Sequence, residues 1–376
     1  MMTKPYPTGE FAVGTKTFTI YNTRKEVLDA RGESMRHVCA RIYYPTLKES
    51  TNGLKKAISM SRNEAKGIAK AFKIPLNYDK MEKNGGNLSE AYVDAPFIDG
   101  MKFPLIVFNH GYFSYPEGNS FLLLDLASHG YVVLTVGHPR ESTSADFDDG
   151  TFEMLDTSLS KKMYSPFLGG IIAAYKLTRY KGTLEEQAEL FEKFKNTYCT
   201  FIAGRVDEWI KDTDIAVDHV RKEFSSIIDF TCGIGVSGHS HGGAVAYKYC
   251  QTRDEYVCGI NIDGGLFGNT DGMIMHKPFM QLSSKDNENV VTKGYLNHTA
   301  PAYKVVFNGM KHVGFSDMKY AISSSAMAGK LDPDTAHKYT CKCFLEFFDA
   351  YLKKAKFKPE LASDDVITVT EFAPDK

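Results

Sequence analysis

The amino-acid sequence predicts an α/β protein with a doubly wound, mostly parallel β-sheet. Two apolar runs, residues 104–108 and 131–136, lack the polar alternation of half-exposed strands and suit strands buried on both faces. A helical stretch at 120–128 joins them, and this strand–helix–strand order implies a right-handed crossover between parallel strands. With 376 residues, 43% of them hydrophobic, the chain has ample material for a buried core. Further strands are predicted at 232–237, 257–262, 279–283 and 303–307, and a closing helix at 334–354.

The first segments of the chain are predicted to be antiparallel edge strands. Residues 17–20 and 38–44 roughly alternate between polar and apolar side chains, and Pro45 closes the second run. An insertion at 55–95 follows, with helical character over 58–72. We interpret this insertion as a flap on the main domain.

A second insertion, residues 150–200, is predicted to form a helical cap. The pattern T-L-E-E at 183–186 is typical of a capping box, and it opens an amphipathic run at 184–198. Residues 205–223 suit a helix that packs on the sheet. We therefore expect one domain, residues 1–376, that carries the flap and the cap.

The charge balance argues against nucleic acid as a partner. The chain has 45 Lys plus Arg against 46 Asp plus Glu, so it lacks the basic excess that binding to a phosphate backbone needs. Its seven cysteines are scattered through apolar segments, which favours buried free thiols in a reducing compartment. Cys341 and Cys343 lie two residues apart in a predicted helix and do not share a face. We expect no metal and no cofactor.

The same features predict a soluble, cytoplasmic protein. Residues 1–7 lack an apolar segment of signal-peptide length. No run of 18 uncharged apolar residues occurs, so no membrane-spanning helix is expected.

The strongest functional signal is a G-x-S-x-G sequence at 238–242, between a β-branched strand and an alanine-containing helix. A sharp strand-to-helix turn there places Ser240 in a strained backbone, and Gly238 and Gly242 remove side chains that would clash. The hydroxyl of Ser240 is then presented beyond the strand ends. The backbone N–H of His241 points at a developing oxyanion, beside the positive end of the following helix. The pattern predicts a nucleophilic serine.

A nucleophilic serine needs a general base, and His312 is the histidine best placed for that role. It follows the last predicted parallel strand, so its imidazole can reach over the sheet toward Ser240. His276, His298 and His337 lie before strands or within a helix and are better explained as surface or packing residues.

Two aspartates are candidates for the acid that orients the base. Asp263 comes directly off an apolar strand into a Gly-Gly turn, which is a poor place for a charge that nothing uses. Asp286 follows the next strand among Ser, Lys, Asn and Glu, like an ordinary polar loop residue. Either carboxylate could accept a hydrogen bond from His312, and the surroundings favour Asp263.

A second oxyanion donor is expected in the loop that follows the strand at 104–108. Gly111 lets the backbone approach a substrate, with the N–H of Tyr112 aimed inward. His110 is interpreted as a brace that fixes this loop by hydrogen bonding, in preference to a metal ligand.

These motifs together resemble the plasma-type platelet-activating-factor acetylhydrolases, the group VII phospholipases, and their bacterial relatives. The resemblance implies an α/β-hydrolase fold and metal-independent hydrolysis of short or oxidised acyl chains on phospholipid-like esters. The matching pieces span most of the chain in family order: residues 7–14, 107–111, 125–131, 238–243, 259–267 and 312–317.

The resemblance also implies roles for individual residues. By position, Ser240 is the nucleophile, Asp263 the acid and His312 the base, with the amides of Tyr112 and His241 as the oxyanion hole. The separation of Asp263 from Ser240 resembles that of the family, which favours Asp263 over the alternative acid, Asp286.

The departures from the family pattern bear on the substrate. His241 and the pair Gly264-Gly265 replace bulkier aromatic-containing sequence, which predicts a wider or flatter acyl pocket, and the 150–200 insertion has no recognised counterpart. The predicted substrate is a small ester or a short-acyl phospholipid. Alternatives are a polyesterase or other non-lipid esterase, an amidase, peptidase or acyltransferase on the same residues, and a non-catalytic binding protein.

Contact with lipid is an open alternative for two helical segments, residues 58–72 and 167–175. They could form an apolar rim that touches lipid aggregates. Buried packing of the cap is the reading that the sequence favours. The oligomeric state is not specified by the sequence.

Overall fold

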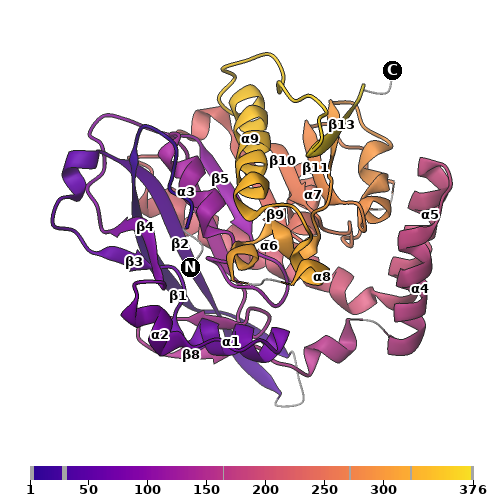
Figure 1. Cartoon of the computed structure of the whole chain (residues 1–376), viewed down its shortest axis with the longest axis horizontal. Coiled ribbons are helices and arrows are strands. Elements are labelled where there is room, and N and C mark those ends of the chain that lie inside the picture. The colour runs from indigo at the N-terminus through magenta and orange to yellow at the C-terminus, as the bar shows by residue number, and fades with distance from the viewer. Residues whose placement is uncertain (1–3, 28–31, 164, 271, 322–323, 374–376) are drawn as a thin grey trace. The chain divides into compact units, whose positions relative to one another are not determined.

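The computed structural model describes residues 4–27, 32–163, 165–270, 272–321 and 324–373. The chain forms two compact units, and Figure 1 labels many of their elements. The N-terminal unit comprises residues 3–158 and 211–231. The C-terminal unit comprises residues 159–210 and 232–376.

The strands of the N-terminal unit lie in the order β5-β6-β2-β1-β4-β3. β5 and β6 run parallel and α3 lies between them in the chain, as the sequence predicts. β2 pairs antiparallel with β6 and with β1, and β1 pairs with β4 on its other side. The elements are β1 (Ala12–Val27), β2 (Glu33–Thr46), β3 (Lys56–Ile58), α1 (Arg62–Phe72), α2 (Tyr78–Lys83), β4 (Leu88–Val93), β5 (Leu105–Asn109), α3 (Ser120–Ser128), β6 (Val132–Gly137), β7 (Ser144–Asp146) and β8 (Phe152–Met154).

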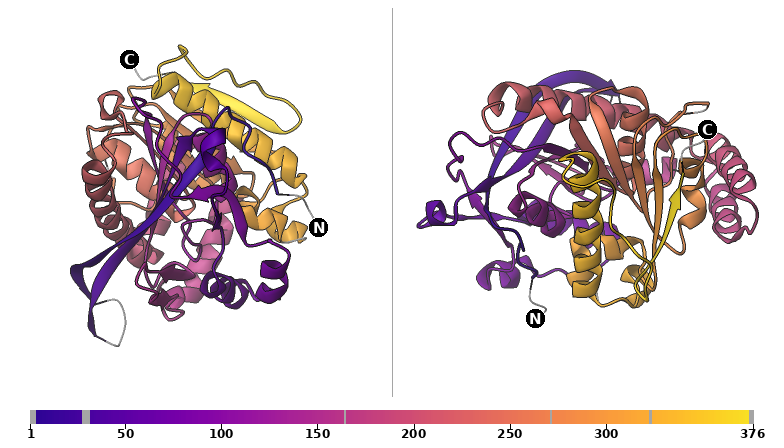
Figure 2. Two further views of the ribbon diagram at one scale, coloured as in Figure 1. Left: turned by 90° about the vertical axis from the view of Figure 1, so that its left-hand side faces the viewer. Right: turned by 90° about the horizontal axis from the view of Figure 1, so that it is seen from above.

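The predicted edge position of the first two strands is wrong. β1 and β2 are antiparallel as expected, but they form a long twisted ribbon of 16 and 14 residues (Figure 2). Each of them has a neighbour on both sides. The reason is that the 55–95 insertion contributes β3 and β4, which extend the sheet beyond β1.

The strands of the C-terminal unit lie in the order β9-β10-β11-β12-β13. The first four run parallel and correspond to the four strands predicted there, whereas β13 is antiparallel to β12 and was not predicted. These strands are β9 (Ile234–His239), β10 (Tyr256–Ile262), β11 (Phe279–Ser284), β12 (Ala302–Phe307) and β13 (Ile367–Phe372).

Helices cover both faces of the C-terminal strands. α7 follows β9 and packs on one face, and α9 lies across the other (Figure 2). α4 and α5 pack against each other as a helical hairpin (Figure 1). α5 begins at the predicted capping box, in which the Thr183 side chain accepts from Glu186 N at 3.3 Å. The helices are α4 (Phe167–Arg179), α5 (Leu184–Tyr198), α7 (His241–Thr252), α8 (Ser325–Ala328), α9 (Pro333–Tyr351) and α6 (Thr200–Glu223), whose last turns, from Lys211, belong to the N-terminal unit.

Short 3₁₀ helices lie in the connections. One of them, η6, begins with a residue of the candidate site, and η4 begins directly after another, Asn287. They are η1 (Lys48–Thr51), η2 (Leu159–Lys162), η3 (Phe230–Cys232), η4 (Glu288–Val290), η5 (Thr292–Tyr295), η6 (His312–Phe315) and η7 (Asp317–Tyr320).

The central strands form the core of each unit. Every residue of β5, β6 and β9 is buried, which explains why their sequences show no polar alternation. Six of the seven cysteines are buried free thiols and Cys232 is half-buried. Within the described ranges, no helix combines the length and the apolar character needed to cross a bilayer.

Candidate active site

The turn between β9 and α7 presents a strained serine. β9 ends at His239 and α7 begins at His241, so Ser240 alone makes the turn, with φ 56° and ψ −117°. A non-glycine residue at positive φ is held there only when the surroundings enforce it. The backbone N–H of Ser240 donates to Ile262 O on the neighbouring strand at 2.7 Å. This is the nucleophile-elbow geometry that the G-x-S-x-G sequence predicts.

The structure brings Ser240, His312 and Asp263 into one hydrogen-bonded chain. His312 opens η6, just after β12, and its Nε2 lies 3.0 Å from Ser240 Oγ. Its Nδ1 lies 2.7 Å from Asp263 Oδ2. The Asp263 side chain is fully buried and that of His312 is 41% exposed, so the imidazole bridges the interior and the surface.

The Asp263 side chain is surrounded by hydrogen-bond partners from two segments of the chain. It follows β10 at φ 52°, and its Oδ1 accepts from Ser284 N at 2.5 Å. Its Oδ2 accepts from Ser284 Oγ at 3.1 Å and from Asn287 Nδ2 at 2.8 Å, in addition to His312. Hydrogen bonds of this number offset the cost of burying the polar oxygens of Asp263.

Asp286 lies outside this chain of contacts. Its carboxylate pairs with Lys311 Nζ at 2.7 Å, and its side chain is 63% exposed. The geometry therefore favours Asp263 among the two acids that the sequence left open.

Asn287 is a site residue that the sequence analysis missed. Besides donating to Asp263, its Nδ2 lies 3.4 Å from His312 Nδ1. Its only sequence signal is its place beside Asp286, in the polar loop after a predicted strand. A polar residue in such a loop is ordinary, so nothing local marks it.

Two further histidines flank the serine. The His239 ring lies over His312, with centroids 4.8 Å apart, and its Nε2 is 3.1 Å from His312 O. The His241 ring is buried edge-on against the buried Trp209, with centroids 4.6 Å apart. The side chain of His241 is thus part of the packing of α7, while its backbone N–H belongs to the first turn of that helix.

Sequence comparison identifies the family of this chain. The family model described as "Platelet-activating factor acetylhydrolase, isoform II" matches residues 2–360. The chain belongs to this family.

Curated relatives agree with this assignment, and a solved structure shares the fold. The platelet-activating factor acetylhydrolase of Cavia porcellus is 21% identical over 294 residues, 74% of this chain and 65% of the relative. That of Gallus gallus is 23% identical over 279 residues, 69% of this chain and 64% of the relative. The chain thus spans slightly less than two thirds of their length. A ferulic acid esterase from Streptomyces cinnamoneus is similar at 19% identity with a TM-score of 0.66, covering 97% of this chain and 98% of that one, which shows the α/β-hydrolase fold.

The first glycine of the pair Gly264-Gly265 leaves no room for a side chain. A Cβ on Gly264 would lie 1.9 Å from Ser240 O, so the turn after Asp263 packs directly on the backbone of the elbow. Asn261 fixes that turn, because its Nδ2 donates to Gly264 O at 2.6 Å and its Oδ1 accepts from Gly264 N at 3.0 Å. A Cβ on Gly265 would meet the ring of Phe267 at 2.8 Å. The predicted wider or flatter acyl pocket stays a prediction.

The loop of the second predicted oxyanion donor belongs to the N-terminal unit. His110 is fully buried; its Nδ1 lies 2.7 Å from Gly111 O and its Nε2 lies 2.8 Å from Ser142 Oγ. The ring thus braces the loop, as the sequence predicts. Tyr112, two residues on, is buried, and its amide as an oxyanion donor stays a prediction.

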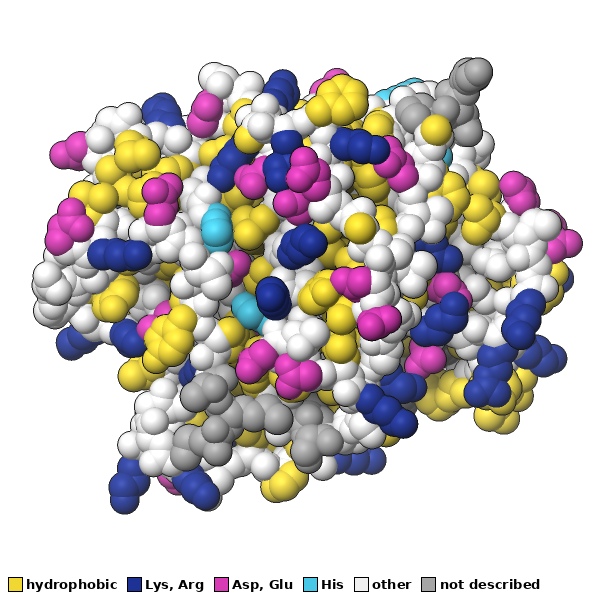
Figure 3. Space-filling model, turned by 45° about the horizontal axis from the view of Figure 1, so that its top comes forward, with side chains coloured by type: hydrophobic (Ala, Val, Ile, Leu, Met, Phe, Trp, Pro, Cys, Tyr) yellow, Lys and Arg dark blue, Asp and Glu magenta, His cyan; other side chains and the backbone are white. Residues whose placement is uncertain are grey.

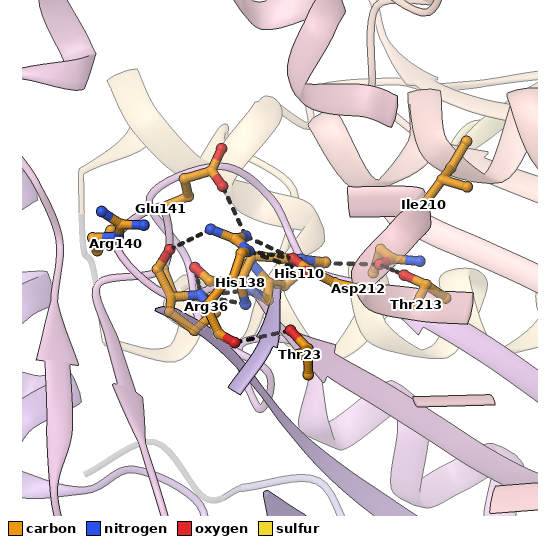
Figure 4. Close-up of polar contacts among 12 residues, drawn as sticks. Thr23, Arg36, His110, His138, Arg140, Glu141, Ile210, Asp212 and Thr213 are labelled. Atoms are coloured by element: carbon orange, nitrogen blue, oxygen red, sulfur yellow. Dashed lines mark hydrogen bonds and ion pairs between the residues drawn. The ribbon is translucent and has the colours of Figure 1, made fainter. Parts of the chain in front are cut away.

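A buried ion cluster lies beside this loop within the N-terminal unit (Figure 4). Arg36 is at its centre and donates to Asp212 Oδ2 at 2.6 Å, to Glu26 at 2.8 Å and to Glu141 at 3.0 Å. Although burial opposes ionisation, the charge of Arg36 holds the pKa of Asp212 well below its ordinary value. None of these residues was singled out from the sequence.

His138 connects the ion cluster to the end of β5. Its Nδ1 lies 2.8 Å from Asp212 Oδ2, and its Nε2 lies 3.0 Å from Asn109 Oδ1, which also accepts from Thr213 Oγ1 at 2.9 Å. Burial lowers the pKa of His138 despite the nearby carboxylate. A neutral ring suits this position, because Asp212 is already neutralised by Arg36.

Proposed function

We propose that this protein is a serine hydrolase that cleaves carboxylic esters with short acyl groups through an acyl-enzyme. One observation carries the proposal: Ser240 Oγ, His312 Nε2, His312 Nδ1 and Asp263 Oδ2 form a continuous chain at 3.0 and 2.7 Å, on a strained strand-to-helix turn. Family membership supports ester hydrolysis as the reaction.

In the proposed mechanism, each side chain of this hydrogen-bonded series either moves a proton, forms a bond or stabilises a charge. His312 Nε2 takes the proton of Ser240 Oγ as the oxygen attacks the ester carbonyl, and Asp263 stabilises the imidazolium that forms. The backbone N–H groups of His241 and Tyr112 hold the oxyanion of the tetrahedral intermediate. The imidazolium then protonates the leaving alcohol, and a water activated by the same ring releases the acyl group.

The substrate class we propose is a short-acyl phospholipid or a similarly small ester. Relatives that the chain resembles over about two thirds of their length are named platelet-activating factor acetylhydrolases, which supports a short acyl chain on a lipid-like alcohol. The solved structure of similar fold is named for a ferulic acid ester, so the fold by itself does not restrict the alcohol or the acid.

Matched substitutions of the two aspartates test the proposal. Asp263→Asn should lower kcat on p-nitrophenyl acetate by about 10⁴-fold, because the amide holds the wrong tautomer of His312. Asp286→Asn, whose carboxylate faces Lys311, should change kcat by less than about twofold. Ser240→Ala should abolish turnover and labelling by a fluorophosphonate.

Three results would contradict the proposal. Undiminished hydrolysis by Ser240→Ala removes the serine from the mechanism. A large loss in Asp286→Asn with none in Asp263→Asn reverses the assignment of the acid. Faster cleavage of a matched amide than of the ester assigns the protein to the amidases. A series of p-nitrophenyl esters from acetate to longer chains, run beside a short-acyl phospholipid, measures the acyl-chain preference.

A further inference from the structure

A small cavity of about 230 Å³ lies within the N-terminal unit, against the β1–β2 ribbon. Residues 17–19 of β1 and 39–41 of β2, which pair with each other in the sheet, form one wall. The other walls come from the 55–95 insertion, from the residues before α3 and from the end of β7. Pockets for drug-sized ligands measure about 300–1,000 Å³, so this cavity suits a smaller ligand.

Four carboxylates line this cavity. Glu64 and Glu117 are buried, Asp146 is half-buried and Asp148 is exposed, so acidic groups extend from solvent into the interior. Arg41 is the one cation among the described residues of the lining. On the face of the molecule in Figure 3, by contrast, Lys and Arg side chains are interspersed with Asp and Glu. A cavity lined mainly by carboxylates attracts cations.

Glu117 holds a buried oxygen that the chain leaves without a hydrogen bond. The residue is 6% exposed, and its Oε1 lies 2.7 Å from Arg41 Nε. Its Oε2 is buried and accepts no hydrogen bond from the residues that the structure describes. Arg41 cannot serve both oxygens equally, because its Nη1 donates to Ile58 O at 2.9 Å. A buried carboxylate oxygen without a donor is costly, so Oε2 is suited to a donor from a ligand.

Asp146 offers a second oxygen to the same cavity. Its Oδ1 accepts from Ser144 Oγ at 2.6 Å and from Asn63 Nδ2 at 3.4 Å. Its Oδ2 has no donor among the described residues. Two carboxylates that come from different segments thus each keep one oxygen for a ligand.

The electrostatic potential in the cavity is negative. Burial raises the pKa of the Glu64 carboxyl well above its ordinary value, and the charges of Glu117 and Asp146 raise it further. The charge of Arg41 opposes this rise only in part. Burial also raises the pKa of the Cys39 thiol, and the same carboxylates add to that rise. A bound cation would relieve the repulsion that both shifts report.

The spread of the carboxylates indicates which kind of cation fits. Among the described residues, no three acidic, histidine or cysteine side chains converge closely enough to hold a metal ion. An organic ammonium ion has several N–H donors and an apolar stem, so it can contact carboxylates that do not meet at one point. Cys39 and Phe147, which line the cavity and belong to one apolar cluster, offer a surface for that stem.

We propose that this cavity binds a small organic ammonium ion, and that a linear diamine fits it best. One ammonium group would donate to Glu117 Oε2 and the other to Asp146 Oδ2, in charge-assisted hydrogen bonds. The bound ion would join segments around α1 and β7, which already pack against each other. The site lies wholly within the N-terminal unit and contains none of the residues proposed for hydrolysis, so it is independent of the proposed esterase activity.

Isothermal titration calorimetry of the full chain with putrescine, a linear diamine, tests the proposal. Butanediol serves as the uncharged analogue and magnesium chloride as the inorganic cation. We expect saturable binding of putrescine, no binding of butanediol and weaker binding of Mg²⁺. Putrescine should also raise the thermal unfolding midpoint of the chain. Glu117→Gln should weaken putrescine binding at least about tenfold, because a charge-assisted hydrogen bond is lost.

Two further variants separate recognition from folding, and all variants are checked by thermal unfolding without ligand. Asp146→Asn keeps an acceptor for Ser144 and Asn63, so it should fold as the parent does and weaken putrescine binding at least about threefold. Asp94→Asn is the matched control. It removes one carboxylate of the same unit, which is 66% exposed and pairs with Lys16 at 2.7 Å outside the cavity. It should bind putrescine as the parent does.

The contrary outcomes are equally defined. A parent chain without saturable putrescine binding at millimolar concentration overturns the proposal, and so does butanediol binding as tight as that of putrescine. Equal weakening by Asp146→Asn and Asp94→Asn attributes the binding to net charge instead of the cavity. Tighter binding of Mg²⁺ that Glu117→Gln abolishes assigns the cavity to a metal ion instead. None of these outcomes bears on ester hydrolysis by Ser240, so failure here and failure of the proposed function are told apart.

Discussion

Replacing Gly264 by alanine tests how tightly the turn after Asp263 is packed against the elbow. The added Cβ would lie 1.9 Å from Ser240 O, whereas ordinary contacts begin at 3.4 Å. The two backbones would have to separate by about 1.5 Å, and a displacement of about 1 Å at reacting groups costs about 100-fold in rate. Gly264 is not in the left-handed region, so this effect is steric alone. We expect kcat/KM on p-nitrophenyl acetate to fall at least about 100-fold, with about 1–3 kcal/mol lost from the free energy of unfolding.

Gly265→Ala is the matched control for this experiment. Its Cβ would meet the far edge of the half-buried Phe267 ring, which can rotate away at little cost. We expect a change in kcat/KM of less than about fivefold. Urea unfolding and fluorophosphonate labelling of both variants separate loss of fold from loss of alignment. Wild-type kcat/KM and stability in Gly264→Ala would refute the packing argument.

Three further predictions concern polar residues. Asn287→Ala should lower kcat about tenfold with little change in KM, because Asp263 loses one of its charged hydrogen bonds. An unchanged kcat in steady-state assays would contradict this. Burial lowers the pKa of Lys319 to about 8, so Lys319→Met should raise the free energy of unfolding at pH 7 by on the order of 3 kcal/mol, and the gain should shrink as the pH rises toward 10. A gain that stays constant with pH would contradict that cause. Asp212→Asn should cost about 3–5 kcal/mol in urea unfolding, whereas Asp79→Asn, which breaks an exposed pair with Arg62, should change little. Because the folded pKa of Asp212 is depressed, its ion pairs stabilise the folded state fully above about pH 4, and this stabilisation is lost as the pH falls below that. An equal loss of unfolding free energy in Asp212→Asn and Asp79→Asn would refute the role of burial.

The turn at Ser240 and the position of His312 beside it could be predicted from the sequence because each has a local signature. Ser240 lies in a glycine pattern whose backbone demand is specific, and His312 follows the last of the predicted parallel strands. Asp263 was separable from Asp286 because a charge leaving an apolar strand needs a partner, whereas a charge in a polar loop does not.

The features that the sequence did not predict depend on partners far along the chain. Arg36 and Asp212 are 176 residues apart, and neither lies in a motif. The edge assignment of β1 failed because strand order in a sheet depends on what pairs beyond it, here β4 from an insertion. The strand β13 follows a polar segment and gains its place only by pairing with β12. The large apolar side chains of residues 167–175 in α4 are exposed where the sequence favours burial, because periodicity marks an apolar face without saying what covers it.

The α4–α5 hairpin of the cap and the candidate acid Asp263 both contact one loop, so the insertion also supports the candidate site. Asn287 donates to Asp263, and Asn289 caps α4, with Glu288 between them. Glu288 is held by Lys285 at 3.0 Å and by Lys304 at 3.1 Å, and although burial opposes ionisation these lysines lower its pKa. A loop fixed at three successive side chains has little freedom to move one end without the other. The orientation of α4 is therefore built into the same scaffold that sets the position of Asp263, and a chain without the cap would lose a support of the acid as well as a surface helix.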